Sequence, residues 1–318
     1  MRTDETPDLP GATVRRYATI SFFLLLAAVS LVSLVRFYGI EFYGITGEAS
    51  WLWSHHRVAA DEPEAFFVTR EFELTEAREL VHIRVAADPE YTLWFNGIEL
   101  GGGTWEGPWL DRYDVTALAR PGRNRIVLAA RSPRGVGGVL ASVDTGSMKR
   151  NWLVSDDAWK LHRRWSPELL ARDLDGAESP RLLGRPPFGR WNWLEQRPVA
   201  PAGTWRGHVA PVSRQRFATW LPKVEVKSGV AVAGRVEANA EAFDFGTVRG
   251  RAEIEVKRGP TRAIRVRYAH LPDELERAGV IESFVVAEGE QAVAGPTERT
   301  FRYLIVYDEP VEARVITR

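Results

Sequence analysis

The sequence contains no cysteine in its 318 residues. This absence excludes disulfides, thiolate nucleophiles, cysteine-ligated metals and attachment through a lipidated cysteine, and it leaves the redox compartment open. The chain also lacks an excess of either charge, because 42 basic side chains balance 42 acidic ones. No global field therefore points to nucleic acid or to a polyacidic substrate. Tryptophan, in contrast, is plentiful, and the 12 indole rings suit cores, interfaces or membrane boundaries.

One long apolar run lies near the N-terminus. Residues 17–35 carry no charge and are rich in Leu, Phe, Ala and Val. As a helix rising about 1.5 Å per residue, this run would be about 28 Å long, close to the thickness of a bilayer's hydrocarbon core. A cleaved signal peptide and a buried core helix are the alternatives, but the run exceeds the apolar core of a signal peptide and no small-residue cleavage site follows it. We predict a transmembrane helix over residues 17–36.

Basic residues predict the orientation of this helix. Arg15 and Arg16 precede the span directly, and only Arg36 follows it closely. The positive-inside rule places residues 1–16 in the cytoplasm and the bulk of the chain outside the cytoplasm, across a bacterial inner membrane. The span holds no acidic residue, lysine or histidine, so we expect it to act as an anchor only. An aromatic near-repeat in residues 37–50 resembles a membrane-surface belt, and the predicted interfacial residues are Arg15, Arg16, Phe37, Tyr38, Phe42, Tyr43, Trp51 and Trp53.

Short strands separated by turn residues are predicted from residue 51 onward. Residues 64–74, 80–86 and 91–95 combine β-branched and aromatic residues with partial alternation. Asn96-Gly97 follows the third segment and is a strong hairpin signal, because both turn positions need positive φ. No long amphipathic helix separates the strands. The pattern therefore favours an all-β fold with two β-sandwiches of jelly-roll type.

The motifs of residues 51–160 are similar to those of a known module. In order, they are Tyr91-x-Leu93-x-Phe95-Asn96-Gly97, then Tyr113-Asp114-Val115-Thr116, then Pro121-Gly122-x-Asn124-x-Ile126. This succession resembles the galactose-binding-like jelly roll, and in particular the N-terminal accessory domain of bacterial α-L-rhamnosidases. Asp114 or Thr116 is suited to cap the short turn before the Pro-Gly reversal. The resemblance implies a first β-sandwich over residues 51–160.

Residues 217–318 resemble the second β-sandwich of the same enzymes. This resemblance rests on Asp244-Phe245-Gly246 followed by Gly250, and on the strand that contains Phe301-Arg302-Tyr303. Where those enzymes commonly have Tyr-x-Glu, this chain has Tyr268-Ala269-His270. In that family the acid and base come from a helical-barrel domain of several hundred residues, and the resemblance covers none of it. The resemblance thus implies accessory modules only, and we expect no enzymatic activity.

A basic, tryptophan-rich connector over residues 161–216 joins the two predicted sandwiches. Residues 149–216 carry 13 basic and 7 acidic side chains and six of the 12 tryptophans, and the prolines and glycines among them favour irregular, extended chain. One interpretation is a strap whose tryptophans pack against both sandwiches. The other is a docking surface for protein or for anionic lipid, because Arg and Trp are enriched in interface hot spots. Its candidate residues are Arg163, Arg164, Trp165, Arg190, Trp191 and Trp193.

A candidate carbohydrate site lies after the Asn-Gly hairpin. Trp105, Trp109, Asp111 and Arg112 combine an aromatic platform with hydrogen-bonding side chains, which is what a sugar ligand needs. The alternative is that these aromatic residues plug the end of the sandwich. The histidines and the aspartates near residue 175 lack the spacing of metal ligands, so we predict no metal and no cofactor. The sequence alone singles out no catalytic residue.

Two functions from different classes are consistent with these features. The first is a non-catalytic, membrane-anchored scaffold outside the cytoplasm that holds other integral membrane subunits in a larger complex. A bacterial photosynthetic reaction centre with its antenna is one complex of this kind, although no motif here identifies it. The second is a membrane-tethered, lectin-like protein that binds a glycan. A glycoside hydrolase remnant is a third alternative, and the predicted location argues against nucleic acid as a partner.

Overall fold

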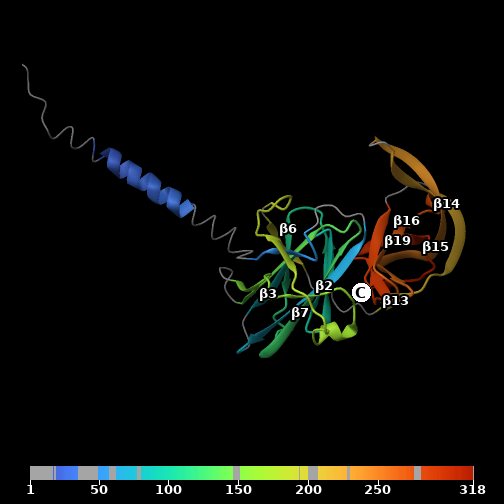
Figure 1. Cartoon of the computed structure of the whole chain (residues 1–318), viewed down its shortest axis with the longest axis horizontal. Helices are drawn as coiled ribbons and strands as arrows, with labels where there is room; N and C mark the ends of the chain where they lie inside the picture. The colour runs from blue at the N-terminus through green and yellow to red at the C-terminus, as the bar shows by residue number, and fades with distance from the viewer. Residues whose placement is uncertain are drawn as a thin grey trace, which may run out of the picture.

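The structure is a computed structural model. It describes residues 17, 19–34, 49–56, 62–76, 80–145, 151–192, 194–199, 207–227, 230–275 and 281–317. Within these residues, the regular structure comprises one N-terminal helix over 19–34, two short 3-10 turns, η1 (Pro167–Leu170) and η2 (Pro272–Glu274), and β-strands. Figure 1 shows two β bodies side by side, with the helix standing clear of both. The predicted all-β fold of sandwich-like sheets is confirmed.

The first body contains twelve strands in two sheets. They are β1 (Trp51–Trp53), β2 (Glu64–Leu74), β3 (Val81–Asp88), β4 (Glu90–Phe95), β5 (Ile98–Thr104), β6 (Trp109–Asp114), β7 (Gly122–Ser132), β8 (Gly138–Thr145), β9 (Asn151–Val154), β10 (Lys160–His162), β11 (Arg181–Gly184) and β12 (Glu195–Val199). One sheet has the order β11-β1-β8-β3-β6-β12, with β9 beside β8, and the other has the order β10-β2-β7-β4-β5. Both β11 and β12 come from the segment predicted as the connector, so this sheet continues to Val199.

The core of the first body lies between its two sheets. Phe66 and Val68 on β2 face Ile83 and Val85 on β3, and all four side chains are fully buried. Alternate residues of a strand point to opposite faces, so an exposed outer face is expected for a sheet with solvent on one side. Strand β7 departs from this pattern and is buried from Asn124 to Ser132. Its outer face is covered by η1 and by the second body, since Ala129 packs with Leu169 and with Val285 and Ala287.

The Asn-Gly hairpin forms as predicted. Asn96 and Gly97 have φ angles of 50° and 85°, and they join β4 to β5. The Asn96 side chain donates to the Leu118 carbonyl at 2.9 Å and accepts from the Arg125 amide at 2.9 Å. The predicted cap at Asp114 is also present, since its carboxylate accepts from the Thr116 amide at 3.0 Å. These two turns hold the end of the sandwich together.

The second body is built from eight strands. They are β13 (Gly207–Val209), β14 (Ser213–Lys227), β15 (Val230–Glu255), β16 (Arg262–Ala269), β17 (Glu282–Val286), β18 (Ala292–Ala294), β19 (Arg299–Tyr307) and β20 (Glu312–Thr317). Strand β15 shifts register between Asp244 and Val248. Its first part pairs with β14 and β19, and its last part pairs with β20 and β18. One bent strand therefore serves both layers around a core that includes Phe243, Ile254 and Phe301.

The motif residues of the second body interlock across its strands. Asp244 accepts hydrogen bonds from the Arg302 guanidinium at 2.9 Å and from the Gly246 amide at 2.8 Å. Gly250 lies so close to β20 that a Cβ atom there would be 2.4 Å from the Ile316 carbonyl oxygen. The aspartate, both glycines and the Phe-Arg-Tyr strand are thus explained by packing within this sandwich.

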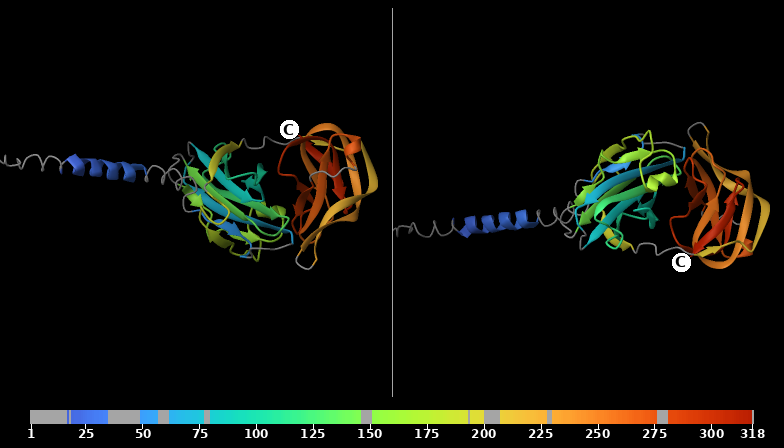
Figure 2. Two further views of the ribbon diagram at one scale, coloured as in Figure 1. Left: turned by 90° about the horizontal axis from the view of Figure 1, so that it is seen from above. Right: turned by 90° about the horizontal axis from the view of Figure 1, so that it is seen from below.

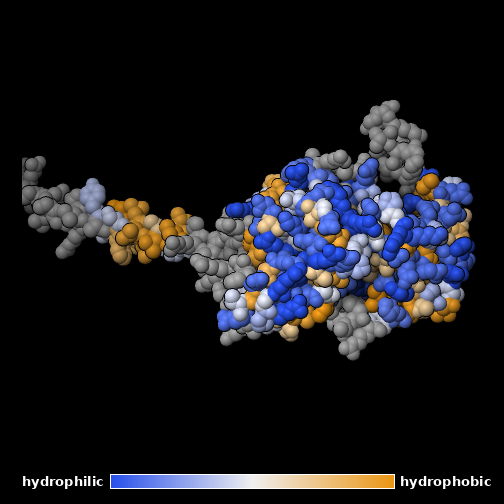
Figure 3. Space-filling model, turned by 60° about the horizontal axis from the view of Figure 1, so that its bottom comes forward, coloured by the Kyte–Doolittle hydropathy of each residue, from blue (hydrophilic) through white to orange (hydrophobic). Residues whose placement is uncertain are grey.

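The N-terminal helix does not pack against the described residues of either body. Every described residue in it is exposed, including Phe22 at 62%, Leu24 at 66% and Leu31 at 61%. Figure 3 shows the helix as an apolar rod beside a largely hydrophilic body, and Figure 2 shows it on the side of the first body away from the second. Over the described residues, no helix has both the length and the apolar character required to traverse a bilayer.

Candidate binding surfaces

The two bodies meet in an apolar contact that includes the connector. Trp165 packs between Phe67 on β2 and Trp94 on β4, with ring centroids 5.0 and 5.4 Å apart. Val285 and Ala287 of the second body complete this cluster, and both are fully buried. The Trp165 amide also donates to the Glu288 carbonyl at 2.8 Å. Trp165, a predicted docking residue, therefore joins the two sandwiches to each other.

Charged pairs surround this apolar contact. Arg131 on β7 is 3% exposed and makes a two-pronged contact with Glu290, at 2.9 and 2.7 Å. Glu290 also accepts from the Ala287 amide at 2.8 Å, so its carboxylate is well satisfied. A second pair joins Arg251 of the second body to Glu99 of the first at 2.5 Å. Arginine forks of this geometry fix orientation as well as supplying attraction.

A third carboxylate at this interface, Glu90, is less well satisfied. Its side chain is 13% exposed, and the Arg131 Nε atom lies 3.8 Å from its carboxylate. Burial raises the pKa of Glu90 to about 7, with the Arg131 charge acting in the opposite direction and the Glu290 charge adding to the rise. Glu90 is thus partly protonated at neutral pH in the folded chain.

The raised pKa of Glu90 predicts a pH-dependent stability. The folded state holds the Glu90 proton up to about pH 7, whereas the unfolded chain releases it near the ordinary carboxyl pKa of about 4.3. The contribution of Glu90 to stability is therefore complete at low pH and is lost as the pH rises towards 7. We expect Glu90→Gln to be more stable than the native chain by on the order of 2 kcal/mol at pH 8 and by much less at pH 5. Denaturant unfolding at both pH values measures this difference.

A matched control separates this effect from general changes in charge. Glu73 is exposed at the end of β2, so Glu73→Gln should shift the free energy of unfolding by less than about 0.5 kcal/mol at either pH. An equal gain for Glu90→Gln at pH 5 and pH 8 would contradict a raised pKa at this position.

The other connector residues also pack against the first body. Trp191 is 5% exposed and stacks on Trp51 with ring centroids 4.5 Å apart, while its Nε1 atom donates to Asp88 at 2.8 Å. Arg190 pairs with the same Asp88 carboxylate at 2.8 Å. Arg163 is paired with Glu178 at 3.0 Å. The first interpretation of the connector, a strap with packed tryptophans, accounts for these contacts.

The remaining connector residues add little surface for docking. Arg164 is exposed and forms an isolated bridge with Glu288, next to the contact between the bodies. Trp193 lies outside the described residues. Docking through the connector stays a prediction, with Arg163, Arg164 and Arg190 as its exposed members.

Two residues predicted at the membrane surface require correction. Trp51 and Trp53 are 0% and 1% exposed, and they lie on β1 inside the first body. Trp53 donates from Nε1 to the Gly135 carbonyl at 3.1 Å and meets Phe66 edge to face. Their closeness in sequence to the apolar run suggested an interfacial role, but both faces of β1 are covered by protein. The other predicted interfacial residues, Arg15, Arg16, Phe37, Tyr38, Phe42 and Tyr43, lie outside the described residues.

The candidate carbohydrate residues do not all converge. Trp109 and Asp111 lie on the same face of β6, whereas Arg112 points to the opposite face. Trp105 is half-buried against Trp51 at a centroid distance of 6.1 Å. Asp111 is 4% exposed and accepts from the Tyr91 hydroxyl at 2.6 Å and from Arg197 Nε at 2.5 Å. The Asp111 carboxylate is therefore already engaged by protein groups.

Three residues of this cluster were missed by sequence reasoning. Tyr91 and Tyr113 share a hydrogen bond of 2.8 Å, and burial raises the pKa of both hydroxyls well above the ordinary value. Arg197 on β12 lies 5.9 Å from the Trp109 ring centroid, and its hydrogen bond to Asp111 raises the pKa of the guanidinium. Alternation along β6 groups Tyr113 with Trp109 and Asp111, but no local signal places β12 beside them. Trp109 is left 36% exposed next to Arg197.

Other titratable side chains form ion pairs and hydrogen bonds within the fold. Asp173 accepts from Arg125 at 2.7 Å and from Thr69 at 2.6 Å, and both contacts contribute to lowering its pKa. In the part of the chain that the structure describes, no group of three or more His, Cys, Asp or Glu side chains is placed to hold a metal ion.

The described strands define a protein of two joined bodies with sandwich-like sheets. Its neighbours among solved structures include α-L-rhamnosidases, the enzymes whose accessory domains the sequence motifs resemble. The chain is similar to an α-L-rhamnosidase from Dictyoglumus thermophilum, with 16% identity, a TM-score of 0.48 and coverage of 85% of this chain and 35% of the enzyme. It is also similar to a GH78 family rhamnosidase from Bacillus sp. GL1, with 18% identity, a TM-score of 0.47 and coverage of 84% and 34%.

A lectin is a further structural neighbour. The apo lectin of Pleurotus ostreatus aligns with 85% of this chain and 76% of its own, at 15% identity and a TM-score of 0.39. This chain spans only about a third of the length of the two rhamnosidases. No protein-family model matches the sequence, and no curated protein matches it.

Proposed function

We propose that the chain is a non-catalytic, membrane-anchored scaffold outside the cytoplasm that holds other integral membrane subunits. The observation that carries this proposal is the exposed apolar helix. A helix that is hydrophobic on all sides needs an apolar environment on all sides, and residues 19–34 receive none from the described part of the chain. The apolar run continues in the sequence from Tyr17 to Val35, which is the length of a bilayer span. Lipid supplies the missing environment.

The joined sandwiches support the scaffold role. The Trp165 cluster and the Arg131–Glu290 pair hold the two bodies in one arrangement. A rigid body on a single anchor presents its surfaces at fixed positions relative to its partners, which reduces the entropy cost of assembly. Helix 19–34 contains no histidine or acidic residue, so the anchor would hold a partner's helices without a chemical role.

Mild detergent extraction tests the scaffold proposal. We expect the intact chain to leave the membrane together with integral membrane subunits in a fixed ratio, measured by mass spectrometry of the purified particle. Recovery of the chain as a lone monomer in detergent, under conditions that keep other membrane complexes intact, would contradict the proposal.

A glycan-binding role is the second candidate, and the exposed ring of Trp109 favours it. This ring lies beside Arg197, and a sugar stacked on it would meet a guanidinium donor. We expect Trp109→Ala to reduce retention on a glycan array at least about tenfold, as loss of a central aromatic contact does. Ile98→Ala, at an exposed apolar position on a different strand, β5, is the matched control. Equal retention of both variants and the native chain would remove support for this site.

A further inference from the structure

The β14–β15 hairpin leaves a long strand edge without a neighbour. Strand β14 runs from Ser213 to Lys227 and pairs only with β15 among the described strands. In Figure 1 this hairpin arches along the outside of the second body and extends beyond it. An unpaired strand edge presents a row of backbone donors and acceptors that an extended polypeptide can bind. The edge alone specifies no partner, but the surface beside it is hollowed and charged.

A groove lies between the start of β14 and the turn that leads into β20. Its main part has a volume of about 650 Å³ and lies between Arg214 and Arg216 on one side and Lys257 on the other. A second part of about 530 Å³ shares Arg216 and Pro310 and continues along β14 to Ala218. Asn239, Ala240 and Glu241 of β15, the strand paired with β14, also line this part, so the groove lies on the face of the β14–β15 hairpin over several residues.

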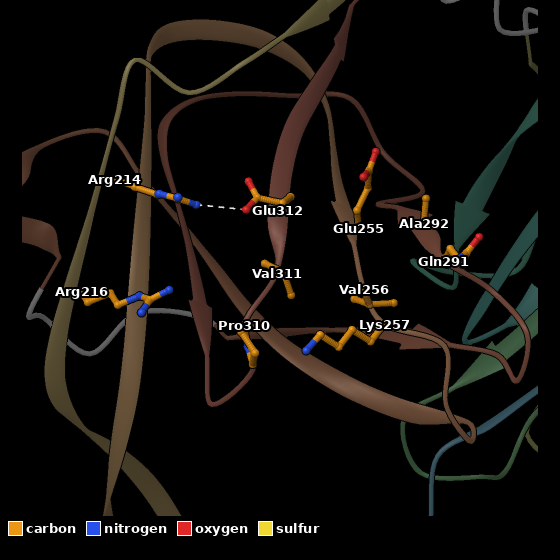
Figure 4. A pocket seen from close by; sticks show the side chains of 10 residues that line it. All are labelled: Arg214, Arg216, Glu255, Val256, Lys257, Gln291, Ala292, Pro310, Val311 and Glu312. Atoms are coloured by element: carbon orange, nitrogen blue, oxygen red, sulfur yellow. Dashed lines mark hydrogen bonds and ion pairs between the residues drawn. The ribbon is translucent and has the colours of Figure 1, made fainter.

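Basic side chains reach into this groove from both walls. Figure 4 shows Arg216 and Lys257 pointing towards one another from the two sides of Pro310. The Arg216 side chain is 75% exposed, and among the described residues it forms an ion pair with Glu241 at 3.4 Å. No described residue makes an ion pair with the Lys257 ammonium. These two cations have most of their hydrogen-bonding capacity available.

Most carboxylates around the groove, in contrast, form ion pairs with arginines that lie outside it. Arg314 pairs with Glu255 at 2.6 Å, and Arg262 pairs with Glu309 at 2.7 Å. Neither of these arginines lines the groove. Glu312 is bound by Arg214 at 3.1 Å, the contact drawn in Figure 4. Glu241 is bound by Arg216 at 3.4 Å and Asp308 by Arg265, so the carboxylates that line the groove have basic partners, and Lys257 is the lining charge without an ion pair to a described residue.

An exposed tryptophan extends the same face of the hairpin. Trp220 is 62% exposed. It follows Arg216 and Ala218 at a spacing of two, so the three side chains share one face of β14. A large exposed aromatic ring next to basic side chains is typical of a protein-binding hot spot. A second copy of this strand would add further basic residues to the edge, so the charge favours a different, acidic partner.

We propose that this groove binds an extended acidic segment of a partner polypeptide. The segment adds to the free edge of β14, places carboxylates between Arg216 and Lys257, and packs an apolar side chain on Trp220. This inference rests on the scaffold function proposed above and names the surface through which a partner is held. Carboxylate binding by guanidinium and ammonium groups supplies the specificity, and the backbone of β14 supplies the direction.

A peptide-binding measurement tests the groove directly. The probe is a fluorescent peptide of alternating glutamate and valine, titrated by anisotropy against the full chain in mild detergent, and the comparison probe has lysine in place of glutamate. We expect saturable binding of the acidic peptide, at least about tenfold weaker binding of the basic one, and loss of affinity at high salt. The double variant Arg216→Glu/Lys257→Glu and the variant Trp220→Ala should each weaken binding at least about tenfold. Arg185→Glu, at an exposed arginine on the first body, should change it less than about twofold.

Several outcomes would overturn the inference. Equal affinity for the acidic and basic peptides, or equal effects of the groove variants and Arg185→Glu, would remove charge recognition by the groove. A detergent-extracted complex that keeps all its subunits in Arg216→Glu/Lys257→Glu would reject the groove while leaving the scaffold function intact. A native chain that carries no subunits at all would reject the scaffold function itself. The peptide titration would then decide by itself whether the groove binds an acidic segment.

Discussion

Arg131→Ala should destabilise the chain by about 3–5 kcal/mol, because it leaves the Glu290 carboxylate buried without its partner. Arg131 is 3% exposed, and both Glu290 oxygens accept from its guanidinium. The loss falls on the contact between the two bodies. We therefore expect thermal unfolding, followed in mild detergent, to separate into two transitions where the native chain shows one.

Two further variants decide whether this loss comes from an unpaired charge. Arg249 pairs with Glu298 at the surface, with 76% of its side chain exposed, so Arg249→Ala should cost less than about 1 kcal/mol. The double variant Arg131→Met/Glu290→Leu removes both charges together and should recover much of the lost stability. A double variant as unstable as Arg131→Ala would show that shape, and not charge, dominates this contact.

Charges placed in the N-terminal helix should move the chain from the membrane to the soluble fraction. Leu25→Arg and Val29→Asp lie near the middle of the apolar run, where each charge costs about 2.5–3.5 kcal/mol in lipid. We expect the double variant to be recovered in the supernatant after cell lysis, whereas the native chain pellets with membranes. The conservative variant Leu25→Val/Val29→Leu keeps the apolar surface and should pellet as the native chain does. A charged variant that still pellets would show that the two sandwiches alone bind the membrane.

The sequence allowed the strands of the two sandwiches to be predicted closely. The expected strand over residues 64–74 is β2, and the Asn96-Gly97 hairpin has the positive φ angles that its residue types imply. Alternation and turn chemistry act over a few residues, so a local pattern is enough to reveal them. The bend in β15 was harder to predict from the sequence. Ala252–Glu255 and the motif near Asp244 belong to one strand, and no local pattern shows that they are continuous.

The connector shows where local patterns fail. Its prolines and glycines favoured irregular chain, yet β11 and β12 complete a sheet of the first body. Pro198 is compatible with β12 because β12 is an edge strand, where a missing backbone donor faces outward. Pairing with β6 depends on contacts across about eighty residues of sequence, and no local rule encodes it.

The sites that could not be predicted are also long-range. Arg131 and Glu290 are separated by 159 residues, so neither has a local pattern that marks the pair. Trp51 and Trp53 were placed at the membrane because they follow an apolar run, but their rings fill the core around β1. Burial depends on what covers a strand in three dimensions, whereas the sequence shows only what precedes it.

Single-cysteine labelling tests the membrane position of the helix most directly. Because the native chain has no cysteine, Leu26→Cys and Val212→Cys each introduce one thiol, in the helix and at an 81% exposed site next to β14. In intact membranes, a water-soluble maleimide should label Val212→Cys rapidly and leave Leu26→Cys unmodified until the membrane is dissolved and the chain unfolded. Labelling of Leu26→Cys in intact membranes at the rate of Val212→Cys would contradict a helix in lipid, and with it the anchored scaffold.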